Sequence, residues 1–575
     1  MTVPNFAKSQ ALSRALLTAR SAVRLKPVQI YGRLLSPPGK PLLPKRTANL
    51  PQWKGLPRLP RTWMECGALG HEPDALVEGR FSFLNRQLAF PEEVDWSAPG
   101  TERLWRYHLH YLGWALALAL DGSPHCLAVL DKRVTEWLQK NFPGSSEGWE
   151  PFPLSVRIVN LAYILSLAGV LSNRLAEMLR TSLAIQARAL RGGIEHSLQG
   201  NHLIKNGKAL LVAGLAYQGA EAEEWFRTGL ALLERELGVQ VYPDGGHGDR
   251  CAMYHAQVLL DYLESIALLE AGGRPCPKDW HDRLETMAVY LDAICHPDGL
   301  PALFGDTSIS CTPPKERLAK LARELDMEPD FLDGCVSHEF PDSSYVMARD
   351  LRRGNYLILD SGAEGNAIEA AHYHCQSFSY ELSLGGRRVV TDTGISSYEI
   401  GPERTLNRSS WSHNTVSWKD RELAEIWGAF RLARRAQILG REVECTTPGA
   451  LRFKGRMRGF YPGANRGSWE REVDWTPEGR LQIVDTWLAP RAAESIVSRI
   501  HFAPGLRLCD ESGGNYGVYL DTGPRIAMLQ VGQGTATRTK TSYHPSFGES
   551  QERDCIEIAL VKNSARYQIM SALSE

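Results

Sequence analysis

The chain has 575 residues, of which 43% are hydrophobic, so it is long enough for more than one domain with large buried cores. Its formal net charge of -1 excludes a strong overall field, so affinity for an acidic ligand has to come from a local basic cleft. Eleven cysteines, an odd number without short paired spacings, indicate reduced thiols and not a disulfide framework.

The N-terminal segment 8–25 is basic and has a helical pattern. Arg14, Arg20 and Arg24 interrupt each apolar run before a signal-peptide core can form. No window reaches the roughly 18 to 20 uninterrupted apolar residues of a membrane span. We therefore expect a cytoplasmic protein without a transmembrane segment. The segment is either a helix packed on the body of the protein or an amphipathic helix on a membrane surface, which would give peripheral association.

Residues 31–100 are rich in proline and tryptophan with few clear periods, which predicts an arm with a short hairpin near 79–88. From about residue 102, helical patterns alternate with Gly, Pro, Asp and Ser clusters. Many are apolar on more than one face, as in the inner helices of a layered helical barrel. The expected helices span 102–120, 126–140, 154–171, 174–191, 201–218, 221–236, 250–271, 279–295 and 315–325.

After about residue 337 the apolar period changes to two, and turns at roughly 8 to 12 residue intervals favour antiparallel sheets stacked as a sandwich. The predicted domains are an arm at 1–100, a helical domain at 101–335 and an antiparallel β domain at 336–575. The expected strands span 344–348, 355–359, 377–383, 387–391, 415–418, 451–454, 469–475, 481–487, 495–502 and 525–531.

One stretch of the β region gathers groups that can bind a metal. His372 and His374 lie two apart at the start of a period-2 run, so both imidazoles are expected on the same side of one strand. A turn at the glycine pair 385–386 would bring Asp392 near His374, and His413 of a later strand would complete the cluster. The three form a candidate zinc site with one open position, although His-x-His pairs without a metal are also common.

Two helical stretches carry polar residues that a core does not require. Asn201 and His202 open a predicted helix, where Asn201 is either a helix cap or, with His202, a holder of a carboxylate. Tyr254 lies just inside a later helix, where a half-buried aromatic residue is also ordinary. No phosphate loop, nucleotide fingerprint or serine nucleophile elbow is present, and no nucleic-acid partner is expected.

The pattern H-x-H, SF-x-x-ELSLGG, D-x-G and R-(x)4-HNTV resembles the C-terminal signature of the heparinase II/III family of polysaccharide lyases, which includes related alginate and chondroitin lyases. NHLIKNGKALLVAGL, DGGHGDRCAMYH and WEPFPLSVRIVN are similar to further segments of that family. The likeness covers most of 100–440. It implies an incomplete α/α toroid followed by an antiparallel β-sandwich, with the active site in the cleft between them.

By this resemblance Tyr254 is the catalytic tyrosine, His372 is the catalytic histidine, and Asn201 and His202 neutralise the carboxylate of an anionic polysaccharide. The zinc ligands would be His374, Asp392 and His413, and we expect a structural zinc because elimination needs no water. Residues expected to line the substrate cleft are Trp105, His108, Arg157, Arg250, Tyr398 and Arg408. A buried ion pair is the alternative for Arg157, and ordinary packing at a helix start is the alternative for Trp105 and His108. The chain departs from the family pattern at Gln376, where an Asp is usual, and at Cys251 and Ala252, where Ser and Pro are usual.

These residue types suit β-elimination from a uronic acid. The proton on C5 becomes acidic only when the neighbouring carboxylate is neutralised, which hydrogen-bond donors can do. For one C5 configuration Tyr254 would be the base and for the epimer His372, and the tyrosine would need a nearby cation such as Arg250, Arg157 or Arg408.

A uronate C5-epimerase and a non-catalytic polysaccharide-binding protein of an exopolysaccharide pathway remain alternatives. A glycoside hydrolase would need a carboxylate pair, for which Asp244 and Asp249 are weak candidates.

Overall fold

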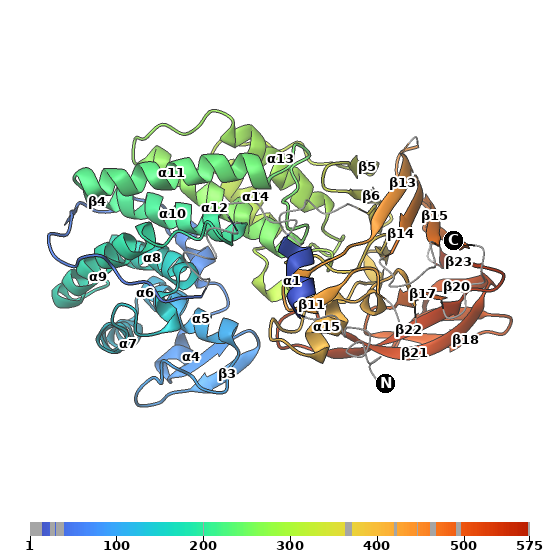
Figure 1. Ribbon diagram of the computed structural model, residues 1–575, viewed down its shortest axis with the longest axis horizontal. Helices are drawn as coiled ribbons and strands as arrows, with labels where there is room; N and C mark the ends of the chain where they lie inside the picture. Colours follow the sequence, from blue (N-terminus) through green and yellow to red (C-terminus); the bar gives the residue numbers. More distant parts are fainter. Residues whose placement is uncertain are drawn as a thin grey trace.

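The computed structural model describes residues 14–22, 29, 39–198, 200–362, 371–418, 422–445, 447–459, 467–489 and 496–572. Its two lobes are a helical one built from the first half of the chain and a sheet lobe built from the second half (Figure 1). The last helix of the first lobe ends at Arg323 and the first strand of the second begins at Cys335. The predicted order, a helical toroid followed by an antiparallel sandwich, is confirmed.

The helical lobe matches the predicted helices closely, with one exception. The expected helix 102–120 is two helices, because buried Leu112 adopts a left-handed φ of 57° that ends the first one. The helices are α5 (Arg103–Tyr111), α6 (Gly113–Asp121), α7 (Pro124–Lys140), α8 (Pro151–Ser166), α9 (Asn173–Arg191), α10 (Asn201–Ala216), α11 (Ala220–Gln240), α12 (Ala252–Ala271), α13 (Trp280–Ala293) and α14 (Lys315–Arg323).

The arm before α5 is more structured than its composition predicts. It contains β1 (Gln52–Trp53), α3 (Arg61–Met64), η2 (Glu65–Ala68), α4 (Pro73–Val77), β2 (Arg80–Phe83) and β3 (Arg86–Ala89). The pair β2 and β3 confirms the predicted hairpin. At its tip Asn85 Nδ2 donates to the carbonyl oxygen of Phe547 at 2.9 Å, so the arm connects the helical lobe to the sandwich.

The sheet lobe is antiparallel throughout its named strand pairs. Its sheets have the orders β5-β6-β7-β8-β9, β10-β17-β22-β21 and β13-β14-β15-β16-β23-β20-β19-β18. The strands around the junction of the lobes are β5 (Cys335–Phe340), β6 (Tyr345–Asp350), β7 (Asn355–Asp360), β8 (Tyr380–Leu384), β9 (Arg387–Val390), β10 (Val416–Trp418), β11 (Ile426–Gly428) and β12 (Arg431–Leu432). The short helices α15 (Pro402–Arg408) and η5 (Ser410–Ser412) lie between β9 and β10.

The remaining strands form the body of the sandwich. They are β13 (Gln437–Glu444), β14 (Leu451–Arg458), β15 (Ser468–Thr476), β16 (Arg480–Leu488), β17 (Ile496–His501), β18 (Leu506–Asp510), β19 (Asn515–Leu520), β20 (Arg525–Gln533), β21 (Thr535–Tyr543), β22 (Gln551–Ala559) and β23 (Ser564–Ser571). All eleven cysteines are free thiols, as their number and spacing predict.

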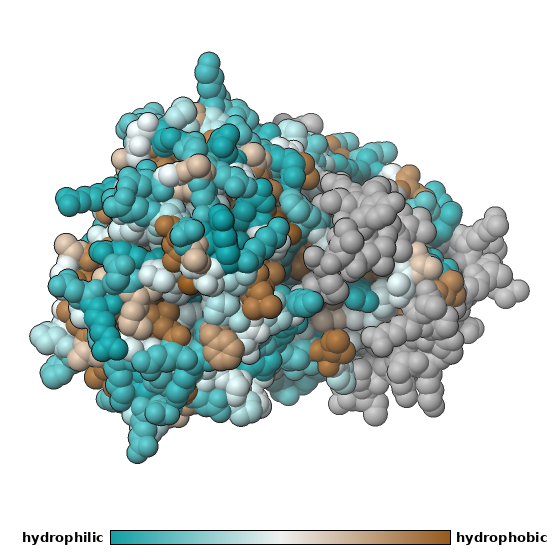
Figure 2. Space-filling view, turned by 60° about the vertical axis from the view of Figure 1, so that its left-hand side comes forward, coloured by the Kyte–Doolittle hydropathy of each residue, from teal (hydrophilic) through white to brown (hydrophobic). Residues whose placement is uncertain are grey.

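The N-terminal helix α1 (Arg14–Ala22) packs on the sandwich, beside β11 (Figure 1). Arg20 forms an ion pair with Glu425 at 2.9 Å, and Trp427 Nε1 donates to Ser21 Oγ at 3.0 Å. Over these residues the segment therefore adopts the first of its two predicted roles. Among the described residues, no helix is both long and apolar enough to cross a bilayer. On the face shown in Figure 2, hydrophobic residues lie in small separate patches among hydrophilic ones.

Candidate active site

The predicted tyrosine and histidine meet at the junction of the two lobes. Tyr254 lies in the first turn of α12, and His372 lies in the loop before β8. Their ring centroids are 4.2 Å apart. The Tyr254 hydroxyl also shares a hydrogen bond of 2.8 Å with the hydroxyl of Tyr398. One residue of the helical lobe and two of the sandwich thus form a compact group.

His372 and His374 are not on a strand, which corrects the prediction. The strand β8 begins at Tyr380, and Phe378 has a left-handed φ of 63° that no regular strand accommodates. The two imidazoles nevertheless reach a common partner, the carboxylate of Asp306. His372 Nδ1 lies 2.8 Å from Oδ2, and His374 Nε2 lies 2.7 Å from Oδ1.

Asp306 is fully buried and also receives both terminal nitrogens of Arg404, with the NH2 nitrogen at 2.8 Å. Burial alone would raise the pKa of Asp306, but Arg404 and the two histidines hold it well below its usual range. Because the anionic carboxylate accepts from Nδ1 of His372, the lone pair of the neutral imidazole lies on the second nitrogen, Nε2. That nitrogen makes no hydrogen bond with any described residue, so it can take a proton from a substrate.

The surroundings of Tyr254 favour its protonated form. Burial raises the pKa of Tyr254 well above its usual value, and the hydrogen bond from Tyr398 offsets only part of that rise. Arg250, one of the cations expected to assist Tyr254, binds other groups. Arg250 donates to the carbonyl oxygen of Ser343 at 2.8 Å and pairs with Asp360 at 3.2 Å.

Asn201 and His202 lie in the first turn of α10, on the helical side of the junction. Asn201 is not the helix cap, because Gly200 occupies that position. His202 Nδ1 lies 3.1 Å from a carboxylate oxygen of Glu195. Burial alone would lower the pKa of His202, but attraction to Glu195 outweighs it, so the pKa is raised and the cationic form is favoured.

Among the described residues, no hydrogen bond or ring contact joins Asn201 or His202 to Tyr254 or His372. The two groups share an electrostatic environment instead. The negative charge of Asp249 is among the influences that raise the pKa of both His202 and Tyr254. The space between them is where a substrate carboxylate would have to lie for the predicted roles to hold.

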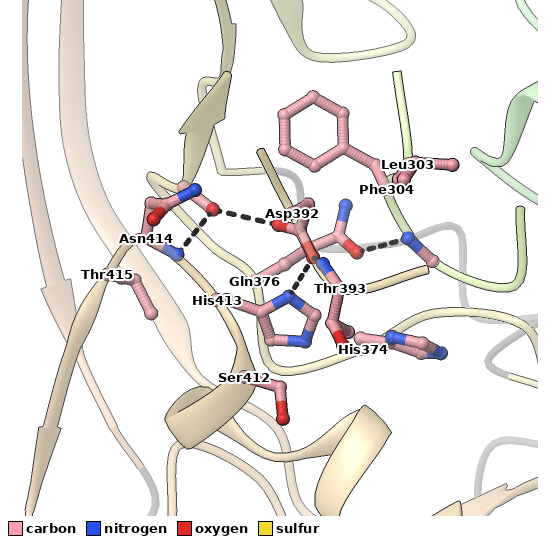
Figure 3. A network of polar contacts seen from close by, with 12 residues as sticks. Leu303, Phe304, His374, Gln376, Asp392, Thr393, Ser412, His413, Asn414 and Thr415 are labelled. Atoms are coloured by element: carbon pink, nitrogen blue, oxygen red, sulfur yellow. Dashed lines mark hydrogen bonds and ion pairs between the residues drawn. The ribbon is translucent and has the colours of Figure 1, made fainter. Parts of the chain in front are cut away.

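The predicted zinc ligands lie together, and one of them, His374, shares the Asp306 carboxylate with His372. The rings of His374 and His413 are 5.3 Å apart, and His413 Nδ1 lies 2.6 Å from Asp392 (Figure 3). His374 Nδ1 and His413 Nε2 are buried without a hydrogen-bond partner among the described residues, which suits nitrogen ligands of a metal. Asp392, however, is occupied by His413, Ser379 and Thr393.

No group of three or more His, Cys, Asp and Glu side chains within the described ranges is arranged to hold a metal ion. The two imidazoles are chemically suited to zinc. Asp392 would have to give up one of its present hydrogen bonds to serve as the third ligand.

Most of the residues predicted to contact substrate are buried instead. Arg157 is wholly buried in the helical lobe and donates to the carbonyl oxygens of His110 and Gly148. Trp105 is also buried and donates to the carbonyl oxygen of Arg86. These contacts make both residues part of the packing of the helical lobe.

The other predicted contact residues differ in exposure. Arg250 and Arg408 are buried, and Arg408 NH1 donates to the carbonyl oxygen of Gly428 at 3.0 Å. His108 is half-buried between Phe83 and Tyr111, and burial lowers the pKa of His108 to about 3. Tyr398 is half-buried and contacts both Tyr254 and His372.

Gln376 supports the histidine loop from a different side than the sequence suggests. Its Oε1 accepts from Gly305 N at 2.7 Å, and its Nε2 donates to Asp360 at 3.0 Å. Gln376 thus fixes Gly305, the residue next to Asp306. Within the described chain its side chain makes no hydrogen bond with a predicted zinc ligand.

Sequence reasoning missed Asp306, Arg404 and Glu195, although each holds an imidazole or its partner. Asp306 lies in an irregular segment, LFGDTS, that has no period and no motif spacing. The signal available in the sequence was a carboxylate in an irregular segment after the last long helix, and this signal is weak.

The helical lobe contributes Tyr254 and the antiparallel sandwich contributes His372 to one site. This arrangement defines a two-lobed protein of the toroid-and-sandwich class. Two family models match the chain: Heparinase II/III N-terminus at residues 71–324, and Heparinase II/III-like, C-terminal at residues 335–569. The chain belongs to the heparinase II/III family.

Comparisons with single proteins agree with this membership. The chain is 23% identical over 407 residues to a protein named heparin-sulfate lyase from Bacteroides stercoris, covering 62% of this chain and 61% of that protein. It is 24% identical over 357 residues to one of the same name from Pedobacter heparinus, covering 57% and 53%. The matched region thus spans between half and two thirds of these curated relatives.

Two solved structures show the same fold. A crystal structure of heparinase III superimposes with a TM-score of 0.69 at 16% identity, over 99% of this chain and 92% of that one. A heparan sulfate lyase from Pedobacter heparinus gives a TM-score of 0.56 at 17% identity, over 97% and 88%.

Proposed function

We propose that the protein is a polysaccharide lyase that cleaves a uronic-acid-containing anionic glycan by β-elimination. The observation that carries the proposal is the pairing of Tyr254 and His372 across the junction of the lobes, 4.2 Å between ring centroids. One member is a protonated phenol and the other an imidazole with a free Nε2, so a proton donor and a proton acceptor are adjacent.

In the proposed reaction the two groups act in sequence on one sugar. His372 Nε2 takes the proton from C5, the C5–H electron pair forms the C4=C5 double bond, and the C4–O bond breaks. Tyr254 gives its proton to the departing oxygen. Asn201 donates a hydrogen bond to the sugar carboxylate and His202 offers a positive charge, which stabilises the charge that develops during proton removal. Each such donor is worth about 2–4 kcal/mol in a preorganised site.

The substrate class follows from the charge of the site and from the named relatives. The raised pKa of His202 favours the imidazolium, which binds an anionic sugar and not a neutral one. Because the curated relatives are named heparin-sulfate lyases, a heparan-type glycosaminoglycan is the first substrate to test.

The test is a screen of the purified protein against heparan sulfate, chondroitin, hyaluronan and alginate, following the ultraviolet absorbance of an unsaturated product. We expect absorbance to rise with at least one glycan, and the variants Tyr254→Phe and His372→Ala to lose at least about a hundredfold in kcat. A matched control is Tyr290→Phe, which removes a buried hydroxyl on α13. If Tyr254→Phe is as active as the parent, the site assignment is wrong.

Zinc is a separate proposal. His374 and His413 would hold the ion, with Asp392 as the third ligand, and the bound charge would fix the loop that carries His372. Metal analysis of the purified protein, with His413→Ala as the comparison, tests it. A metal content below one tenth of an equivalent in the parent after purification without chelator would contradict it.

A further inference from the structure

A turn beside the catalytic pair presents an exposed aromatic ring. Phe430 is at the tip of the hairpin formed by β11 and β12, in which Ile426 pairs with Leu432. Its side chain is 41% exposed, although it lies among buried residues of the site. A single exposed hydrophobic residue is ordinary on a protein surface, so its position needs further support.

The ring stands against the catalytic group itself. Its centroid is 4.9 Å from that of Tyr398 and 5.8 Å from that of His372, with interplanar angles of 61° and 72°. Phe430 therefore forms a wall roughly perpendicular to both rings. A sugar packed on that wall would be next to the base and the acid of the proposed reaction.

Two buried arginines of α15 bind the backbone of the turn. Arg404 Nε donates to the carbonyl oxygen of Ala429 at 2.9 Å, and Arg408 NH1 donates to the same oxygen at 3.1 Å. The Arg404 guanidinium also lies 5.4 Å from the centre of the Phe430 ring. The turn that carries Phe430 is therefore tied to the buried part of the sandwich by two side chains.

Arg404 also joins this turn to the catalytic histidine. The same guanidinium that binds Ala429 binds both oxygens of Asp306, which in turn holds His372. The spacing between Phe430 and the base is therefore set by one continuous set of hydrogen bonds. Such spacing is what a platform for a neighbouring sugar requires, because reacting atoms have to be placed within a fraction of an ångström.

From these contacts we infer that Phe430 is the stacking platform for a sugar ring in the subsite next to the cleaved bond. The C–H face of a sugar carries partial positive charge, which packs favourably on the negative face of an aromatic ring. The inference rests on the proposed function, since it assumes a glycan in this cleft. Phe430 would act in binding and specificity and would transfer no proton.

The experiment measures binding separately from turnover. In a Tyr254→Phe background, the affinity for size-defined oligosaccharides of heparan sulfate, chondroitin sulfate and alginate is measured by calorimetry. We expect Phe430→Ala and Phe430→Leu to bind about tenfold more weakly than the background, and Phe430→Trp to bind as tightly, because tryptophan keeps an aromatic face and leucine does not. In the otherwise native enzyme the alanine variant should raise KM more than it lowers kcat.

The matched control is Phe142→Ala, which removes another exposed phenylalanine, located after α7 in the helical lobe. If Phe430→Ala binds as tightly as the background, the inference fails while the proposed function stands. Equal weakening by both alanine variants would also overturn it, because the effect would then be general. If the background protein binds none of the three glycans, both proposals fail.

Discussion

Replacing Asp306 with asparagine tests the central claim about the site, that one buried carboxylate sets the proton on His372. Asparagine keeps the shape but removes the charge and offers an amide that can donate to Nδ1. His372 would then carry its proton on Nε2, where the lone pair is needed. We expect kcat to fall by about 10²- to 10⁴-fold, the range for losing a correctly placed general base.

The same substitution should cost stability. Arg404 would remain buried without its counter-ion, a loss of about 3–5 kcal/mol when one partner of a buried pair is removed. Because the folded pKa of Asp306 lies below its unfolded value near 4, the wild-type advantage is fully present above pH 4. It is lost as pH falls further, through the folded pKa. Denaturant unfolding at pH 7 and at pH 3 measures the difference.

Asp485→Asn is the matched control, because Asp485 forms an equally buried pair with Arg471 in the sandwich core. It should lose similar stability while the folded fraction keeps its kcat. The reasoning is refuted if folded Asp306→Asn retains kcat within about threefold, a change of less than 1 kcal/mol in the barrier.

Three further outcomes follow from other contacts. Glu195→Gln should lower the pKa of His202, so the rise of KM on the alkaline side moves to lower pH in a pH–rate series. Tyr398→Phe removes a hydrogen bond that lowers the pKa of Tyr254, so kcat should fall by about 3- to 10-fold in steady-state kinetics with KM unchanged. Arg157→Met should reduce the free energy of unfolding by about 2–5 kcal/mol in urea, because buried carbonyls lose their donor, and the folded enzyme should keep its KM.

The helical half was predictable because its signal is local. Apolar periods and Gly, Pro and Ser breaks gave helix positions close to those of α7 to α14. The break at Leu112 was not predictable, since its left-handed backbone is held by burial and not by a glycine.

The strand β22 was missed because buried charges interrupt its alternation of apolar and polar residues. In β22 (Gln551–Ala559), Arg553 and Asp554 are both buried, so the sequence reads as polar where the structure places its core. Arg553 donates to the carbonyl oxygen of Thr391, and Arg538 pairs with Asp554. Only the folded sheet provides these partners.

The candidate site divides in the same way. Tyr254 and His372 were predicted from motifs, and the structure places them together. Asp306 was missed because its role depends on contacts with residues 66, 68 and 98 positions away. No local spacing in the sequence predicts that these residues contact Asp306, because the contacts form only in the folded chain.

The docking of α1 on Glu425 and Trp427 joins parts of the chain that are about four hundred residues apart. During synthesis this helix is made well before its partner hairpin, which spans residues 426–432. The helical lobe can therefore fold first, and α1 can form its contacts with Glu425 and Trp427 only after the sheet lobe has been made.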